Sequence, residues 1–315
     1  MAAFGAGRRP RLTSAPRGRT VCCEAAGATD PAASVAARLR LPSMPLILTP
    51  RSAAAACLSI DLLGILPERV ALLSLDEINS LPVLADGRSC ELGNLFTADG
   101  DLADLAIECR GDFSRVHRVA AGMTAGTVRV VGSVGRHAGE GMSGGRLDIT
   151  GDAGDWLACE LTAGEVRVAG DAGDNVAAAL PGSVMGMRGG RVIVAGRVGH
   201  LLASRLRRGV VAVGGGCGEA AGFEMRAGTV VIGGEVGRQP GLGMRRGSVI
   251  ALADRPRPPA MFRSGAVWRP PFLHLLFRSL AAAGFLPAGA IRPGNWRQWH
   301  GDTLAGGRGE LLHPA

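Results

Sequence analysis

Lysine and tyrosine are absent from this 315-residue chain, and its aromatic residues are limited to eight Phe and four Trp. A core built from large rings is therefore excluded. The sequence also lacks an apolar run long enough to cross a membrane as a helix, so we expect no membrane association. It shows no Ser/His/Asp set and no paired carboxylates, and its six His are scattered. We therefore expect no catalytic residues on this chain.

Cysteine pairs of the C-x-x-C type are likewise missing. The chain has seven Cys, an odd number, at positions 22, 23, 57, 90, 109, 159 and 217. This arrangement argues against a disulfide framework and against a zinc or iron–sulfur site. We expect reduced thiols, a cytoplasmic protein and no metal on this chain.

The positive charge is concentrated near the N-terminus. Residues 1–43 contain seven Arg against Glu24 and Asp30, so this segment carries five of the eight net positive charges. Its composition predicts a disordered tail, and it lacks the apolar stretch of a secretory signal. Met44 begins the first patterned segment, so a true start at Met44 instead of Met1 is one interpretation. Since the basic charge belongs mainly to this tail, we expect no nucleic-acid partner.

Glycine is the residue in excess, with 49 copies. Collagen is excluded because the glycines do not recur at every third position. Instead, one Gly recurs every 19 residues, with a single 26-residue step that contains the seven-residue insertion 180–186. These marker glycines are Gly126, Gly145, Gly164, Gly190, Gly209, Gly228 and Gly247.

Each unit repeats one pattern after its marker glycine. Aliphatic residues stand two and four positions later, as in Val128 and Val130, further Gly residues stand six and nine positions later, and Met or Leu closes the unit. Apolar residues at period two predict a short strand with one buried face. Such a strand cannot bury that face alone, but stacked copies can. The sequence thus predicts an all-β fold, a right-handed parallel β-solenoid (β-helix) with rungs of about 19 residues and an imperfect first rung at residues 105–112.

Small mixed or helical caps are expected at both ends of the solenoid. Ser74 and Glu77 have capping-box spacing, and Pro271 precedes a segment, 272–280, whose apolar residues share one helical face. We expect the C-terminal part to cap the open end of the stack or to dock on a partner. The predicted division is a disordered tail (1–43), a mixed N-terminal cap (44–101), the solenoid (102–253) and a helical C-terminal cap (254–315).

Two ligand-binding interpretations of the glycines are weaker. Gly214–Gly218 is similar to a dinucleotide-binding turn, but no helix pattern follows it. Gly-Asp-Ala-Gly-Asp at 151–155 and 170–174 suggests calcium, but the nine-residue period of calcium-loaded β-rolls is absent. We expect ordinary turn residues at both places.

The unit Gly145-Arg-Leu-Asp-Ile-Thr-Gly-Asp-Ala-Gly154 resembles the glycine-rich solenoid of glutamate synthase C-terminal domains. Further features are the start near Met44, the Leu180-Pro-Gly insertion, the 272–280 segment and the closing residues 301–310. With these, the chain resembles the C-subunit family of formylmethanofuran dehydrogenase, particularly its bacterial relatives in the formyltransferase/hydrolase complex of methylotrophs. The resemblance covers roughly residues 44–315.

This resemblance implies a non-catalytic subunit of an enzyme complex in one-carbon metabolism. Its partners would be the other subunits, and the complex would use a methanofuran-like furan cofactor with an oligoglutamate tail. Whether such a complex hydrolyses the formyl cofactor to formate or oxidises it, as an oxidoreductase, stays open. The alternatives are a glutamate-synthase-type domain serving amidotransfer and a scaffold solenoid without an enzymatic partner.

A column of arginines is the candidate cofactor-binding site. Arg follows the closing Met or Leu at four successive unit boundaries, and a second Arg stands beside two of them. The six residues are Arg188, Arg207, Arg226, Arg245, Arg208 and Arg246. Stacked about 4.8 Å apart, such charges repel one another by roughly 1 kcal/mol per neighbouring pair.

We therefore expect an anion to compensate these arginines. Three sources are possible. The first is intramolecular, from Glu160, Glu219 or Glu224, together with solvent. The second is an extended polyanion such as the implied oligoglutamate tail, because guanidinium groups suit carboxylates. The third is an acidic face of a partner subunit.

Overall fold

The computed structural model describes residues 45–51, 58–100, 104–253, 255–285 and 294–315, which all belong to one compact unit, Pro42–Ala315. Residues 1–43, predicted to be a disordered tail, lie outside the described residues. The helical segments are α2 (Pro67–Val70), α3 (Leu75–Asn79), α4 (Leu92–Leu95), α5 (Pro271–Ala282) and the 3₁₀ turn η1 (Thr303–Ala305). Among the described residues no helix is long and apolar enough to cross a membrane.

Strands dominate the described chain. Those before the regular repeats are β1 (Leu46–Pro50), β2 (Ile60–Asp61), β3 (Pro82–Ala85), β4 (Arg88–Glu91), β5 (Phe96–Asp99), β6 (Ala106–Arg110) and β7 (Val116–His117). The repeats supply β8 (Thr127–Val131), β9 (Arg146–Ile149), β10 (Glu165–Val168), β11 (Arg191–Val194), β12 (Val210–Val213), β13 (Thr229–Ile232) and β14 (Arg246–Ala251). The C-terminal strands are β15 (Arg263–Trp268), β16 (Trp296–Gly301) and β17 (Arg308–Pro314).

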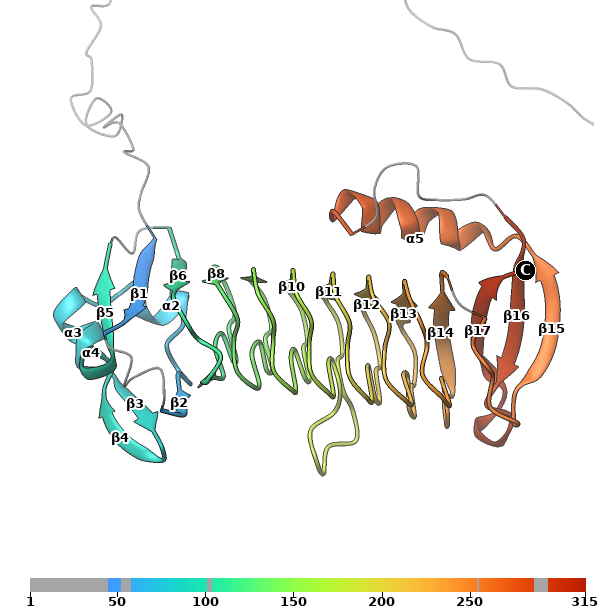
Figure 1. Cartoon of the computed structure of the whole chain (residues 1–315), viewed down its shortest axis with the longest axis horizontal. Coiled ribbons are helices and arrows are strands. Elements are labelled where there is room, and N and C mark those ends of the chain that lie inside the picture. The colour runs from blue at the N-terminus through green and yellow to red at the C-terminus, as the bar shows by residue number, and fades with distance from the viewer. Residues whose placement is uncertain (1–44, 52–57, 101–103, 254, 286–293) are drawn as a thin grey trace, which may run out of the picture. The chain divides into compact units, whose positions relative to one another are not determined.

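The repeat strands lie side by side in one large, mainly parallel sheet (Figure 1). Its 13 strands run in the order β15-β16-β17-β14-β13-β12-β11-β10-β9-β8-β6-β1-β5. The register matches equivalent residues of successive units, so Val128 pairs with Leu147, and Leu147 pairs with Val166. The segment 105–112, predicted to precede the regular units, contains strand β6, which pairs in parallel with β8.

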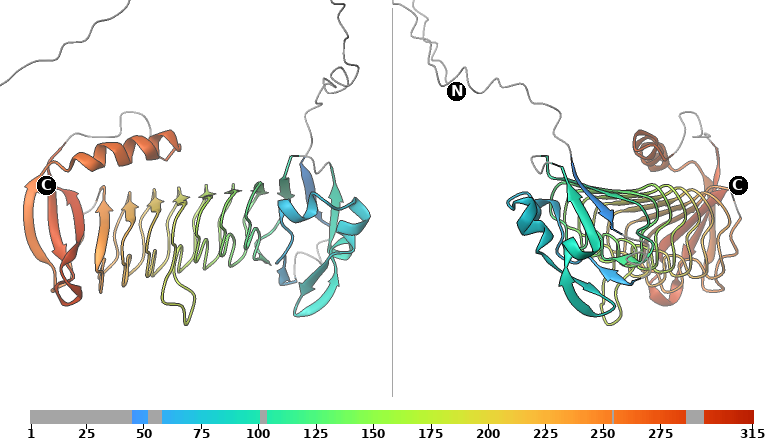
Figure 2. Two further views of the ribbon diagram at one scale, coloured as in Figure 1. Left: turned by 180° about the vertical axis from the view of Figure 1, so that it is seen from behind. Right: turned by 60° about the vertical axis from the view of Figure 1, so that its left-hand side comes forward.

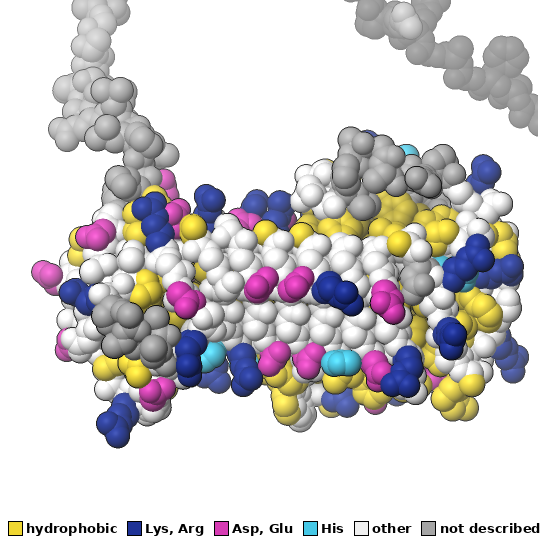
Figure 3. Space-filling view, in the orientation of Figure 1, with side chains coloured by type: hydrophobic (Ala, Val, Ile, Leu, Met, Phe, Trp, Pro, Cys, Tyr) yellow, Lys and Arg dark blue, Asp and Glu magenta, His cyan; other side chains and the backbone are white. Residues whose placement is uncertain are grey.

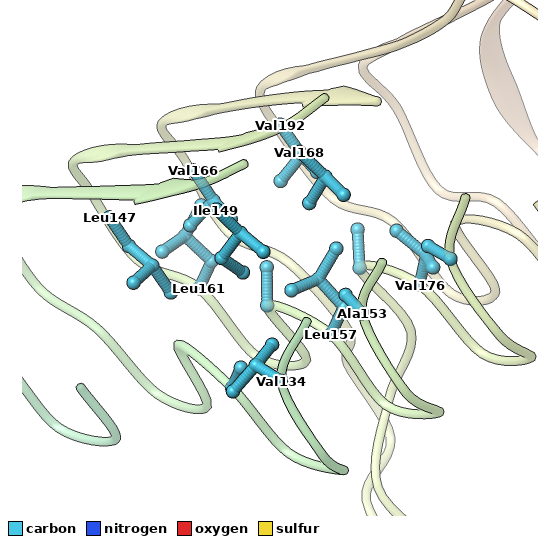
Figure 4. Packing of buried hydrophobic residues seen from close by; sticks show 14 of the residues in the cluster. Val134, Leu147, Ile149, Ala153, Leu157, Leu161, Val166, Val168, Val176 and Val192 are labelled. Atoms are coloured by element: carbon cyan, nitrogen blue, oxygen red, sulfur yellow. The ribbon is translucent and has the colours of Figure 1, made fainter. Parts of the chain in front are cut away.

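A second line of contacts runs through the repeats, eight residues after the marker glycines from Gly126 to Gly228. Isolated parallel bridges join Phe113, Val134, Ala153, Ala172, Val198, Cys217 and Val236 in succession. The core lies between this line and the sheet, where side chains such as Leu147, Leu161 and Val176 point toward one another (Figure 4). The closing residues of the units, including Met142 and Leu161, are completely buried, as expected of the apolar interior.

The marker glycines all have a positive φ, from +73° to +108°. A Cβ at this position would also clash with atoms of the preceding unit. At Gly145, for example, it would lie 2.7 Å from the carbonyl oxygen of Gly126. The glycines six and nine positions later are needed mainly because the backbone of the preceding unit lies close to them, and less because of their own backbone conformation. At Gly154, for example, a Cβ would lie 2.8 Å from the backbone of Gly135.

The turn that closes each unit uses left-handed backbone at every second residue, and several of these residues are not glycine. Examples are His137 (φ +61°), Trp156 (φ +63°) and Glu160 (φ +53°). Each such residue costs about 1–2 kcal/mol. Hydrogen bonds between units offset this strain: the His137 N–H donates to the next unit, at Asp155, and the Gly139 N–H donates to the preceding one, at Val119.

The N-terminal elements follow the mixed pattern expected of them. Ser74 and Glu77 form the predicted capping box at the start of α3, and β4-β3-β2-β7 make a separate four-stranded sheet. β1 inserts between β5 and β6 and thereby joins these elements to the large sheet.

The C-terminal part differs from the expected helical cap. The predicted helix exists as α5, but it lies along one face of the large sheet, where its buried residues Leu273, Phe277 and Leu280 pack on β11–β14 (Figures 1 and 2). The end of the stack is covered instead by β17, which pairs in parallel with β14, and by β16 and β15. The reason is that the outward strand positions are apolar here, at Ile193, Ala212, Val231 and Ile250. Packing α5 on this face removes its apolar surface from water.

Candidate functional site: an arginine pocket

The arginine column sits on a backbone fixed by the stack. The N–H groups of Arg207, Arg226 and Arg245 donate to the carbonyl oxygens of the preceding closing residues, Met187, Leu206 and Met225, at 2.8–2.9 Å. Arg188 does the same toward Leu161 at 2.7 Å. The repeat therefore presents one guanidinium per layer from equivalent backbone positions.

Five arginines line one pocket of about 400 Å³. They are Arg207, Arg226, Arg245, Arg246 and Arg308, with Ala305 and Gly306 completing the wall. Four of the six predicted site residues are thus brought together, whereas Arg188 and Arg208 are exposed but do not line the pocket. The fifth arginine of the pocket is Arg308. It lies there because β17 pairs with β14, which sets Arg308 opposite Arg246.

The non-arginine wall is anchored by a buried carboxylate. Asp302, only 2% exposed, accepts hydrogen bonds from the N–H groups of Leu304 and Gly243. Its own N–H donates to Met244 of the repeat. The η1 turn that carries Ala305 and Gly306 is therefore tied directly to the layers that carry the arginines.

The pocket arginines have no acidic partner among the described residues. None of the three glutamates expected as an intramolecular source of compensation pairs with a pocket arginine. Glu219 pairs with Arg238 and Glu224 pairs with Arg205, while Glu160 accepts a hydrogen bond from the Leu180 N–H. Five neighbouring guanidinium groups without a carboxylate make a strongly electropositive pocket.

The lining of the pocket defines what it can do chemically. It consists of five arginines, an alanine and a glycine. Guanidinium groups donate paired hydrogen bonds to carboxylates or phosphates, but they stay protonated and cannot act as bases or nucleophiles. The arrangement suits the binding of an anion with several charges.

The aspartates of the two Gly-Asp-Ala-Gly-Asp segments act as turn residues, as expected. The Oδ1 atoms of Asp152 and Asp155 accept hydrogen bonds from the N–H groups of Asp171 and Asp174 in the next unit, at 2.8 and 3.1 Å. Charged side chains form rows across the repeats in Figure 3. The Gly214–Gly218 turn includes the bridge residue Cys217 and no helix follows it, so its predicted turn role is confirmed as well.

The cysteines of the described residues are free thiols: Cys90, Cys109, Cys159 and Cys217. Burial raises the pKa of Cys109 to about 12 and also raises the pKa of Cys217. The thiols of Cys109 and Cys217 are thus poor nucleophiles in the isolated chain.

Fold and site together define a class: a glycine-rich parallel β-repeat protein with a pocket of clustered arginines. No family model matches the sequence, and no curated protein matches it. Among solved structures, the chain is similar to a chain of the formyltransferase/hydrolase complex (FhcABCD) from Methylorubrum extorquens, determined in complex with methylofuran. The two are 34% identical, the match covers 85% of this chain and 99% of the other, and the TM-score is 0.79. The chain therefore belongs to the formylmethanofuran dehydrogenase-like subunit family represented in that complex.

Proposed function

We propose that this chain is the non-catalytic C-type subunit of a formyltransferase/hydrolase complex. In this role it assembles with the other subunits, and its arginine pocket holds the acidic tail of a methanofuran-like cofactor. The observation that carries the proposal is the pocket of five arginines without a carboxylate partner among the described residues.

The similar structure supports the cofactor class. That complex was determined with methylofuran, and an oligoglutamate tail is what the family resemblance implies for such cofactors. Successive arginines one strand spacing apart, about 4.8 Å, suit an extended chain that carries a carboxylate on each residue. The matched complex is a formyltransferase and hydrolase, which supports hydrolysis of the formyl group over its oxidation.

The architecture fits a structural role. We infer that the repeats form a right-handed β-solenoid at residues 102–253, flanked by segments 44–101 and 254–315. Two lines of parallel contacts and one interior core, repeated layer by layer, support this description. The free thiols of the described residues support a reducing, cytoplasmic setting.

The test is a binding comparison on the assembled complex. The double variant Arg207→Gln/Arg226→Gln should bind the long-tailed cofactor about tenfold more weakly for each arginine removed, while the affinity for a tail-free analogue stays unchanged. Arg197→Gln, at an exposed arginine that does not line the pocket, is the matched control.

Two outcomes would contradict the proposed tail binding. Equal weakening of the binding of the long-tailed cofactor and of the tail-free analogue would mean that the arginines do not bind the tail. Loss of assembly with the other subunits, at unchanged stability of the isolated variant, would assign the arginines to an acidic partner face instead.

A further inference from the structure

Three metal-ligating side chains converge at one turn, away from the residues that line the arginine pocket. His137 and Glu140 belong to one unit, and Cys159 belongs to the next. One ligand atom from each, the imidazole nitrogen, a carboxylate oxygen and the sulfur, lies within 4.8 Å of the other two. Glu140 and Cys159 stand 14 residues after their respective marker glycines, so the stacking of equivalent positions brings them together.

Two of these atoms are buried and lack a hydrogen bond. His137 Nδ1 and Glu140 Oε2 lie 2.8 Å apart, within ion-pair distance. Neither atom has a hydrogen-bond partner among the described residues. A buried polar atom without a partner is unfavourable. Two atoms with lone pairs that face one another in this way are suited to a shared cation.

The three side chains are held in place before any ion binds. The ring of Trp156 stacks on that of His137, with centroids 6.0 Å apart and planes within 6°. The His137 N–H donates to Asp155, and the Gly141 N–H donates to the carbonyl oxygen of Cys159. Ligands on such a framework lose little freedom when they bind an ion.

The fold does not require a carboxylate or a thiol at these two positions. Equivalent positions in other units hold Ala121, Ala178, Ser204, Phe223 and Leu242. Ala121 and Ala178 are buried, so an alanine fills the same place in the stack.

The charges that surround the cluster favour a cation. Arg118 lies 3.9 Å from Glu140, but its closer partner is Asp61, at 2.9 Å. Glu160 also acts electrostatically on Cys159. Two carboxylates, those of Glu140 and Glu160, thus act on the Cys159 position against one guanidinium, which Asp61 also pairs.

We propose that His137, Glu140 and Cys159 bind a divalent transition-metal ion of the zinc type. Zinc takes imidazole nitrogen, carboxylate oxygen and thiolate sulfur together, whereas calcium and magnesium prefer oxygen ligands alone. The thiol proton leaves to solvent when the sulfur binds the ion. The side chains of His137 and Glu140 are 26% and 24% exposed, so a fourth ligand position is open to water. The sequence predicts no metal on this chain because these three residues match no contiguous metal-binding motif.

The test uses the full chain, freed of metal with a chelator. Co²⁺ titration should produce thiolate-to-cobalt charge-transfer absorption, Zn²⁺ should displace it, and equilibrium dialysis should give one tightly bound Zn²⁺ per chain. Cys159→Ala should abolish the absorption and weaken Zn²⁺ binding at least about a hundredfold, because loss of a direct ligand should cost no less than the about 10–100-fold of losing an outer-shell partner. Glu140→Ala should weaken Zn²⁺ binding while keeping the cobalt–thiolate absorption.

Cys217→Ala is the matched control, because Cys217 is also a buried thiol of the stack, in a different column. It should bind Zn²⁺ like the unaltered chain. Zn²⁺ should also raise the melting temperature of the unaltered chain and of Cys217→Ala, but not that of Cys159→Ala. The proposal is overturned if the folded chain binds no Zn²⁺, or if Cys159→Ala binds it as tightly as the unaltered chain does.

Discussion

The Asp171 carboxylate accepts a hydrogen bond from the backbone N–H of Arg197 at 2.6 Å, although the two residues are 26 positions apart. In the preceding unit, Asp152 makes the same bond to Asp171 across the regular 19 positions. The insertion 180–186 lies between Asp171 and Arg197, yet the strands on either side keep their register, Val166 opposite Val192. The insertion therefore does not change the register of the stacked units on either side of it.

Deletion of residues 180–186 should accordingly be tolerated. It would join Ala179 to Met187, the residues that correspond to Glu160 and Leu161 in the unit before. Because loop length contributes only weakly to stability, about 0.6 kcal/mol per doubling, we expect a folded protein whose melting temperature changes by only a few degrees. Circular dichroism with thermal unfolding measures this, and loss of the cooperative transition would show that the insertion is needed for the fold.

The marker glycines should be far less tolerant than glycines outside the stack. A Cβ at Gly209 (φ +108°) would lie 2.5 Å from the Met187 side chain and 2.8 Å from the Gly190 carbonyl oxygen. We expect Gly209→Ala to lower the free energy of unfolding by about 2–4 kcal/mol, from backbone strain together with overpacking.

Gly182→Ala separates these two contributions. Gly182 also has a positive φ, +83°, but a Cβ there would meet nothing within 4 Å. Only the conformational cost, about 1 kcal/mol, applies there. Urea unfolding of both variants measures the difference, and similar losses for the two would rule out the close approach between layers as the reason for the glycine.

Much of the stack could be predicted because its determinants are local and repeated. Alternating aliphatics such as Val128 and Val130 specify a strand, and copies of the same unit leave one favourable register. The left-handed residues of the turn were not predicted where they are not glycine, as at Trp156. Their strain is offset by hydrogen bonds between units, which composition does not show.

The place of α5 depends on a sequence change that period-two patterning does not reveal. Three positions after the marker glycine, the early units carry Arg129, Asp148 and Arg167. The later units carry Ile193, Ala212, Val231 and Ile250 at this position. The outer face of the sheet is thus charged in one half and apolar in the other, and α5 covers the apolar half.

The arginine pocket was predictable in part. The columns of the repeat bring Arg207, Arg226 and Arg245 together, so their spacing alone places them in adjacent layers. Arg308 lies outside the repeats, and its place opposite Arg246 follows from pairing between β14 and β17. Such a long-range pairing has no local signal.

Removal of the Phe277 ring should release α5 without unfolding the stack. Phe277 is 5% exposed and lies 6.0 Å, ring to ring, from Trp296. We expect Phe277→Ala to weaken helix packing by about 3–5 kcal/mol and to raise hydrogen exchange in residues 271–282, with β8–β13 still protected. Leu275→Ala, at a side chain that is 68% exposed, is the control and should change little. Equal loss of protection throughout the sheet would show that α5 and the repeats unfold as one unit.

His117 should make the stability of the protein depend on pH below neutrality. Burial lowers the pKa of His117, and the positive charge of Arg136 adds to this. Its Nδ1 accepts the Arg136 N–H at 2.9 Å, and its Nε2 lies 3.0 Å from Ser59 Oγ. The folded state therefore holds the neutral ring, with the proton on Nε2.

The sign of the effect follows from this lowered pKa. Above about pH 6.5, the ordinary pKa of histidine, both folded and unfolded states hold a neutral ring and stability is complete. As the pH falls below that value, the unfolded state takes up the proton first, so stability decreases until the pKa of the folded state is reached. The carboxyl groups with lowered pKa, Glu77 and Asp112, have ordinary values of 4.5 and 3.8. Their stabilising effect is therefore lost only at lower pH.

His117→Asn tests this assignment, because the amide oxygen can accept the Arg136 N–H in place of Nδ1 but does not titrate. Urea unfolding between about pH 7.5 and 5, the range in which an ordinary histidine titrates, should show stability falling in the unaltered chain and a flatter dependence in the variant. The same slope in both proteins would assign the pH dependence to other groups.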